Sequence, residues 1–315
     1  MYSRIKKLIP PFLIVCFTLM SPPLNADILQ TYKGTLPQPT EAEWQEMLEN
    51  RQERHACKQK TAKALNDYKF AKLALNPTPT ANQIKVDMLY YEINFELNFS
   101  TETIDGFSES KIKAIYDGVD AVDFNLTDLL NVYSVELNGN NISNYNHTND
   151  ILTIYLGQQF TTGEQFTIKI DYGGTPGFDG TDGLNFYSDW GMDIAYTNCE
   201  PWGARLWWPC KDHPYDKPDS VDIIITHPSS KTLVSNGVMR SSTNNGDGTY
   251  TTHWHESYPI ATYLVQIGCA DYNLYTDSWE YEAGETMPIY NYSYNGVPAS
   301  SGYYSTYYMR TFTKP

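Results

Sequence analysis

The residues best suited to chemistry lie in one run near the middle of the chain. From Thr197 to Pro214 the sequence is Thr-Asn-Cys-Glu-Pro-Trp-Gly-Ala-Arg-Leu-Trp-Trp-Pro-Cys-Lys-Asp-His-Pro. No regular helix or strand requires such a mixture, which is typical of a loop that packs against the protein and carries binding residues. Within this run Glu200 is a carboxylate, which can hold a cationic group through a charge-assisted hydrogen bond.

Two further groups contain residue types that bind metals or form disulfides. His253 and His255 are alternate residues of one predicted strand, so both point to the same side. A zinc site needs a third ligand, so we prefer two polar, solvent-facing histidines and keep the metal site as the alternative. Cys199 and Cys210 both lie in the run and are the preferred pair if exported cysteines form a disulfide. No His-Glu-x-x-His motif occurs in the 315 residues.

The elements that position these residues are predicted to be mainly strands. From Tyr91 to Phe99 apolar and polar residues alternate, which predicts a strand with one buried face. Residues 220–227 predict a strand buried on both faces. Short strands between polar turns, such as Asn138-Gly139, favour antiparallel sheets. Further strands are predicted at residues 111–116, 121–125, 132–137, 151–156, 165–172, 263–268 and 287–292.

The sequence of the first 82 residues predicts a signal peptide, followed by a helical extension and linker, before the first strand. Residues 1–26 have a basic start and a short apolar stretch, which indicates a signal peptide and a secreted or periplasmic protein. An uncleaved anchor is the alternative, but Pro10 and Pro11 interrupt the apolar stretch, so we expect no stable membrane insertion. Residues 27–82 predict a helical extension and linker, with the helix from Glu41 to about Lys72.

The overall charge limits the classes of partner. The chain has a formal net charge of −15 at pH 7, and the acidic residues are spread along it. Because nucleic acid and anionic membrane surfaces repel such a chain, we expect neither as a partner.

The run from Thr197 to Pro214 resembles a segment of the amino-terminal domain of the aminopeptidase N family of zinc metallopeptidases (peptidase family M1). Ser235-Asn236-Gly237, Trp254 and the stretch from Tyr258 to Leu264 follow in the order found in that family. The resemblance extends from about residue 84 to 277. It implies a mainly β fold, a saddle-shaped antiparallel β-sheet domain at residues 83–277, and the start of a truncated catalytic domain at 278–315.

The resemblance also implies roles for single residues. Glu200 matches the glutamate that binds the free amino group of the substrate peptide. Asn198 replaces a glutamine of the family and is one methylene shorter, so it is a second substrate-binding candidate. Arg205 and Asp212 look structural in the family, and we expect them to pair and brace the loop. The family's zinc ligands lie in the catalytic domain, so we expect none in this chain.

Two functional hypotheses follow. In the first, the chain is the amino-terminal, substrate-anchoring domain of an exported zinc-dependent aminopeptidase. It then packs on a catalytic domain that these 315 residues lack, and it is inactive alone. In the second, it is a non-catalytic peptide-binding or accessory β module that has lost the metallopeptidase domain.

Overall fold

The computed structural model describes residues 78–178, 182–189 and 191–295. Strands occupy most of these residues, and the predicted mainly β fold is confirmed. The signal-peptide and helix predictions for residues 1–26 and 41–72 lie outside the described residues. The described part falls into two compact units, residues 78–271 and residues 272–295. Within these ranges no helix is long and apolar enough to cross a membrane.

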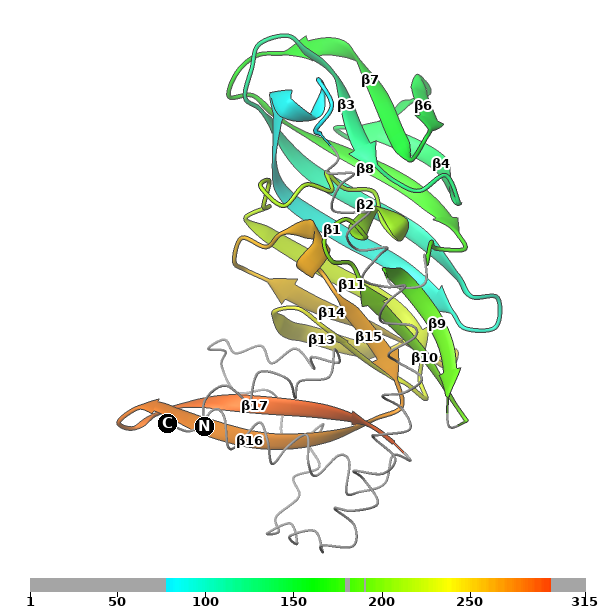
Figure 1. Ribbon diagram of the computed structural model, residues 1–315, viewed down its shortest axis with the longest axis vertical. Helices are drawn as coiled ribbons and strands as arrows, with labels where there is room; N and C mark the ends of the chain where they lie inside the picture. Colours follow the sequence, from blue (N-terminus) through cyan, green and yellow to red (C-terminus); the bar gives the residue numbers. More distant parts are fainter. Residues whose placement is uncertain (1–77, 179–181, 190, 296–315) are drawn as a thin grey trace, which may run out of the picture. The chain divides into compact units, whose positions relative to one another are not determined.

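The first unit contains three sheets (Figure 1). The largest has eight strands in the order β13 (Val238–Asn244), β14 (Thr249–Glu256), β11 (Ser220–Pro228), β1 (Val86–Asn98), β2 (Thr103–Ala114), β8 (Gln165–Gly174), β4 (Leu130–Leu137) and β5 (Asn140–Ile142). The second has the order β12 (Thr232–Ser235), β15 (Ile267–Ala270), β10 (Met192–Asn198) and β9 (Gly183–Asp189). The third has the order β3 (Val119–Asn125), β7 (Ile151–Phe160) and β6 (Tyr145–Thr148).

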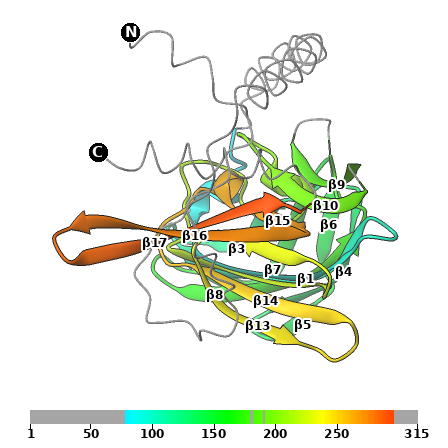
Figure 2. The same ribbon diagram turned by 90° about the horizontal axis from the view of Figure 1, so that it is seen from below.

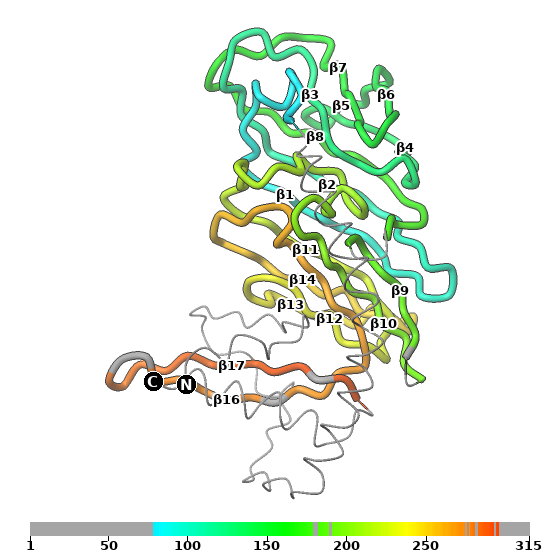
Figure 3. The backbone as a smooth tube through the Cα atoms, viewed as in Figure 1, coloured from blue at the N-terminus to red at the C-terminus, as the bar shows by residue number. Residues whose placement is uncertain are grey.

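The two smaller sheets lie on the same side of the eight-stranded sheet, as Figures 1 and 2 show. The core lies between the eight-stranded sheet and the two smaller sheets. The inward-facing residues of β1, β8 and β11 belong to this core. Three short 3-10 helices complete the unit: η3 (Gln83–Lys85), η4 (Ala204–Leu206) and η5 (Thr262–Leu264). In the trace of Figure 3, the segment between β10 and β11 crosses the covered side of the large sheet.

The strand pairing differs from the prediction at one place. β1 pairs in parallel with β11, from Tyr90 opposite Ser220 to Glu96 opposite Thr226. The other pairs among the described strands are antiparallel. A parallel pair needs a long crossover, and here the chain from β2 to β10 supplies it in place of a helix. The expectation of purely antiparallel sheets is therefore wrong for this pair.

Strand β1 confirms the predicted alternation and extends it toward the amino terminus. Val86 and Met88 are buried, and the buried positions resume at Tyr91, Ile93 and Phe95. A register shift between Met88 and Tyr90 explains the change of phase. A bulge adds one residue, so the inward face moves from even to odd positions.

Strand β2 begins earlier than predicted. Its inward positions include Gly106, Ser108 and Ser110, and both serines are fully buried. Ser108 and Ser110 lie opposite Ile93 and Tyr91 of β1. A run of small polar residues is typical of a turn, so the sequence did not predict this part of the strand. Here Ser108 and Ser110 face the large side chains of the neighbouring strand.

Two other strand predictions need correction. In β11 only one face is fully buried, because Val221, Ile223 and Ile225 are buried while Ile224 is half-buried. The predicted strand at 263–268 is divided into η5 and β15. The side chain of Asn236 donates to the Leu264 carbonyl (2.9 Å) and accepts from the Gln266 amide (2.6 Å), which holds the turn between them.

The second unit is a single hairpin of β16 (Tyr272–Glu282) and β17 (Glu285–Tyr294). The predicted strand at residues 287–292 is therefore confirmed. The boundary between the two units falls after Asp271.

Candidate functional site

Strand β10 carries the candidate substrate-binding residues to one edge of the motif loop, which we define as residues 199–213. Asn198 is the last residue of β10 and is half-buried. Its amide Nδ2 donates to Oδ1 of Asp182, which is fully buried, at 3.3 Å. Glu200 follows after one residue and is exposed, and among the described residues its carboxylate has no ion-pair or hydrogen-bond partner. The loop therefore presents a negative charge to solvent beside a polar side chain.

The expected pair of Arg205 and Asp212 holds the motif loop together. Nε of Arg205 donates to Oδ2 of Asp212 at 2.8 Å, and their side chains are 16% and 1% exposed. Oδ1 of Asp212 accepts from the Thr262 hydroxyl at 3.3 Å. Breaking such a buried pair by removing one partner leaves an uncompensated charge, which costs about 3–5 kcal/mol. Arg205 and Asp212 thus lie inside the loop and do not face the solvent beside Glu200.

Asn125 fastens the motif loop to the end of β3. Its backbone N–H donates to the Cys210 carbonyl (2.7 Å), and its carbonyl accepts from the Cys210 N–H (3.1 Å). Its side-chain oxygen accepts from the Asp212 N–H (3.0 Å) and from Nε2 of Gln83 (2.7 Å). Sequence patterns did not identify Asn125, because nothing local distinguishes an asparagine whose partners lie far along the chain.

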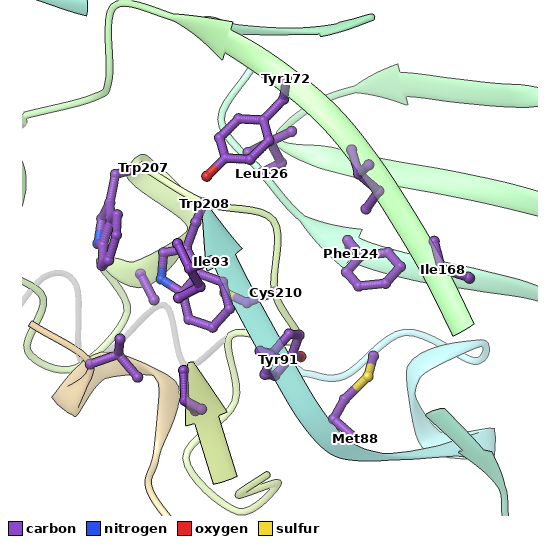
Figure 4. Close-up of a cluster of buried hydrophobic side chains, with 14 of the residues drawn as sticks. Met88, Tyr91, Ile93, Phe124, Leu126, Ile168, Tyr172, Trp207, Trp208 and Cys210 are labelled. Carbon is purple, nitrogen blue, oxygen red and sulfur yellow. The ribbon is translucent and has the colours of Figure 1, made fainter. Parts of the chain in front are cut away.

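Two tryptophans anchor the motif loop in the core (Figure 4). Trp207 and Trp208 are fully buried and lie edge-on to Phe95 and Tyr91 of β1, with ring centroids 6.0 Å and 4.8 Å apart. The Tyr91 hydroxyl accepts from the Lys211 N–H at 3.0 Å. Burying two indoles contributes several kcal/mol, so this loop is as much a part of the core as a strand.

Cys199 and Cys210 are free thiols, so the preferred disulfide is not formed. Sγ of Cys199 accepts a hydrogen bond from Nε1 of Trp207 at 3.2 Å, while the backbone of Cys210 pairs with Asn125. Burial raises the pKa of both thiols well above the ordinary range, which keeps them unreactive.

An aromatic row begins in the motif loop at Trp202 and was not anticipated from the sequence. Trp202, His213 and Tyr215 are neighbours, with ring centroids 5.8 Å and 5.2 Å apart. Tyr215 is 90% exposed. Burial and the nearby Lys211 ammonium lower the pKa of His213, which favours the neutral imidazole. No periodicity marks such a row, because its members meet only when the loop folds back on itself.

The two histidines of β14 share one carboxylate. Nε2 of His253 and Nδ1 of His255 lie 2.6 Å and 2.7 Å from Oδ1 of Asp222, and the Tyr90 hydroxyl donates to Oδ2 at 2.7 Å. Burial acts to raise the pKa of Asp222, but these hydrogen bonds outweigh it and lower the pKa. Across residues 78–178, 182–189 and 191–295 no group of three or more His, Cys, Asp or Glu is arranged to hold a metal ion.

The chain is similar to several known proteins. A curated relative, leucine aminopeptidase 2 of Vanderwaltozyma polyspora, is 24% identical over 186 residues, which are 57% of this chain and 28% of the relative. Among solved structures, an M1 zinc metallopeptidase from Deinococcus radiodurans is 20% identical with a TM-score of 0.55, covering 63% of this chain and 44% of that one. Its E323A mutant gives a TM-score of 0.62 at 20% identity, covering 70% and 51%.

These similarities cover only part of each relative. The chain spans about a quarter of the length of the curated relative and about half of the solved structures. At 20% identity the solved structures show the fold alone. The model of the family described as the peptidase M1 N-terminal domain matches residues 87–264, which include most of β1 and the whole motif loop. Because that match covers more than half of the chain, the protein belongs to the peptidase M1 family through its N-terminal domain.

Proposed function

We propose that this chain anchors the amino terminus of a peptide substrate for an exported zinc-dependent aminopeptidase. Glu200 takes the ammonium group, and Asn198 contributes a polar contact beside it. The observation that carries the proposal is the exposed Glu200 carboxylate, which has no ion-pair or hydrogen-bond partner among the described residues and stands on a loop whose other charged residues are paired.

The chemistry of such a contact suits an exopeptidase. A carboxylate that meets the substrate ammonium forms a charge-assisted hydrogen bond. This contact sets how far the first peptide bond lies from the anchor, so the reacting bond is positioned by the end of the peptide. The rigidity of the motif loop supports this role, because Trp207, Trp208 and Asn125 hold the segment that follows Glu200.

The zinc of the proposed enzyme does not fit the described part of this chain. The 315 residues contain no His-Glu-x-x-His, and the described residues hold no metal-binding group. The Asp222 cluster places its donor atoms at hydrogen-bond distance from one another. We therefore assign this chain substrate anchoring and derive no catalytic step from it.

The alternative is a peptide-binding or accessory module without a catalytic partner. The same Glu200 carboxylate supports it, because binding an ammonium requires no metal. The two proposals differ in what the chain does alone. In the first, it needs a catalytic domain to complete the cleft. In the second, the chain itself binds a peptide with a free amino terminus, and acetylation of that terminus abolishes binding in calorimetry.

Glu200→Gln tests the anchoring role in the complete enzyme. This change keeps the shape of the side chain and removes its charge. A charge-assisted hydrogen bond is worth about 1.5–3 kcal/mol, so kcat/KM should fall by roughly tenfold to a hundredfold for peptides with a free amino terminus. The free energy of unfolding should stay within about 0.5 kcal/mol, because Glu200 is exposed.

Glu96→Gln is the matched control, because Glu96 is an exposed glutamate on β1. It should leave kcat/KM unchanged. Peptides with an acetylated amino terminus should be poor substrates for wild type and for both variants. Unchanged kinetics in Glu200→Gln would remove Glu200 from the substrate site.

A further inference from the structure

A buried aspartate contacts the side chain of Asn198, one of the two candidate substrate-binding residues. Asp182 is fully buried, and its Oδ1 accepts the hydrogen bond from Nδ2 of Asn198 at 3.3 Å. Asn198 is only half-buried. This pair therefore joins a carboxylate inside the protein to a polar side chain at its surface.

The surrounding backbone confines Asp182 to this position. The next residue, Gly183, lies opposite Asn198 in the pairing of β9 with β10. Gly183 has φ of +114°, and a Cβ placed on it would lie 2.0 Å from the carbonyl oxygen of Gly177. A Cβ placed on Gly203 of the motif loop would lie 2.9 Å from Cβ of Asp182. Asp182 is thus enclosed between the start of β9 and the motif loop.

The side-chain hydrogen bond is not needed to hold the two strands together. β9 and β10 pair continuously from Met192 opposite Asp189 to Asn198 opposite Gly183. β10 also pairs with β15 on its other edge. Because this pairing already fixes the backbone of Asn198, what Asp182 adds is the orientation of the Asn198 amide group.

We propose that Asp182 is a positioning residue that turns the carbonyl oxygen of Asn198 toward the substrate ammonium. An ionised carboxylate has only acceptors, so it must meet the amide nitrogen of Asn198 and not the amide oxygen. The oxygen Oδ1 of Asn198 therefore points away from Asp182. The inference rests on the proposed function, and it adds a second acceptor to the carboxylate of Glu200. An ammonium group has three N–H donors and can use both acceptors.

The charge of Asp182 strengthens the same arrangement. Linked hydrogen bonds polarise one another in a medium of low dielectric constant, so a buried carboxylate on the nitrogen of an amide makes its oxygen a better acceptor. Asp182 and Glu200 also place two negative charges around one amide. A protonated amino terminus gains from both acceptors and both charges. An acetylated terminus is neutral and loses the charge-assisted part of this binding.

Asp182→Asn in the complete enzyme tests the positioning role. The new amide offers a donor as well as an acceptor, so it no longer dictates which end of the Asn198 side chain faces the substrate. KM for peptides with a free amino terminus should rise roughly three- to tenfold, as expected for the loss of one hydrogen bond. The value of kcat should stay within about twofold, because the ammonium is bound alike before and during the reaction.

Asp193→Asn is the matched control, because it changes an aspartate at the other end of the same strand pair. Asp193 lies on β10, and its Oδ1 accepts from the hydroxyl of Ser188 on β9 at 2.5 Å. Losing a charge from this strand pair should by itself leave KM unchanged.

Two further variants separate orientation of the amide from a general effect on structure. The exchange Asp182→Asn/Asn198→Asp places the donor inside and the carboxylate outside, so the internal hydrogen bond and an outward acceptor both return. Its KM should be within about twofold of the wild-type value. In Asn198→Ala the KM should rise by about the same factor as in Asp182→Asn, and adding Asp182→Asn should change it no further, because no amide remains to be oriented.

The outcomes distinguish this inference from the proposed function. An unchanged KM in Asn198→Ala, or an exchange variant that binds no better than Asp182→Asn, would overturn the positioning role. Additive effects of Asp182→Asn and Asn198→Ala on KM would overturn it too, because Asp182 would then act by another route. If these results appear while Glu200→Gln still lowers kcat/KM, only the positioning role fails. If Glu200→Gln has no effect, the proposed function fails with it.

Discussion

At the residue scale, Tyr91 and Tyr172 show that two equally buried side chains can differ in whether the hydroxyl forms a hydrogen bond. Both side chains are fully buried in the core of Figure 4. The Tyr91 hydroxyl accepts from the Lys211 N–H, whereas the Tyr172 hydroxyl has no partner among the described residues. The two tyrosines therefore contribute similar apolar burial and different hydrogen bonding. Their phenylalanine variants isolate that difference.

Tyr91→Phe should lower the free energy of unfolding by about 1–3 kcal/mol, because the buried Lys211 N–H loses its acceptor. Tyr172→Phe should change it by less than about 1 kcal/mol, because no bond to a described residue is broken. Urea unfolding followed by tryptophan fluorescence measures both values. An equal loss in the two variants would mean that the Lys211 contact does not stabilise the motif loop.

At the element scale, the motif loop keeps its shape because its segments approach closely. A Cβ placed on Gly203 would lie 2.8 Å from Cα of Cys199 and 2.9 Å from Cβ of Asp182. The Gly203 N–H also donates to the Cys199 carbonyl at 2.9 Å. Gly203 has φ of −99°, so it is required for space and not for a left-handed backbone. This close approach positions the residues on either side of Glu200.

Gly203→Ala should therefore weaken the anchoring of substrate as well as stability. We expect a loss of about 1–3 kcal/mol in unfolding free energy from overpacking, with a rise in KM in the complete enzyme. Gly246→Ala is the control: its φ is +82° and a Cβ there would meet nothing within 4 Å. It should cost about 1 kcal/mol through backbone strain and leave KM unchanged. An unchanged KM in Gly203→Ala would show that the shape of the motif loop does not affect substrate binding.

At the scale of the whole molecule, a buried histidine links stability to pH. His227 is 3% exposed, with Nδ1 3.1 Å from the Pro228 carbonyl and Nε2 2.9 Å from the Thr252 hydroxyl. Burial lowers the pKa of His227 below its ordinary value of 6.5. Below pH 6.5 the unfolded chain therefore binds a proton that the folded chain does not. Stability then falls as the pH falls, until the pH passes the lowered folded value.

His227→Gln should remove this part of the pH dependence. Between pH 7.5 and 6.5 the variant and wild type should have nearly parallel stability curves. Below about 6.5 the wild-type curve should fall more steeply, by at most about 1.4 kcal/mol per pH unit for one proton. Urea unfolding at a series of pH values gives both curves, and other groups cancel in the difference. Parallel curves down to pH 5 would show that His227 has the same pKa in the folded and the unfolded chain.

The sequence by itself determined the features that depend on neighbouring residues. Alternation revealed β1 and β11, since successive side chains of a strand point to opposite faces. Asn138-Gly139 predicted the hairpin turn between β4 and β5, where both residues have positive φ. The run around Glu200 led to the family through the types and order of its residues.

Only the tertiary structure decided which distant residues meet. The parallel pairing of β1 with β11, the bonds of Asn125 to the motif loop and the convergence of His253 and His255 on Asp222 all join residues far apart in the chain. Strand periodicity is set within a few residues, whereas pairing partners are chosen by packing over the whole core. Cys199 and Cys210 are likewise free, buried thiols, which their spacing in the sequence did not reveal.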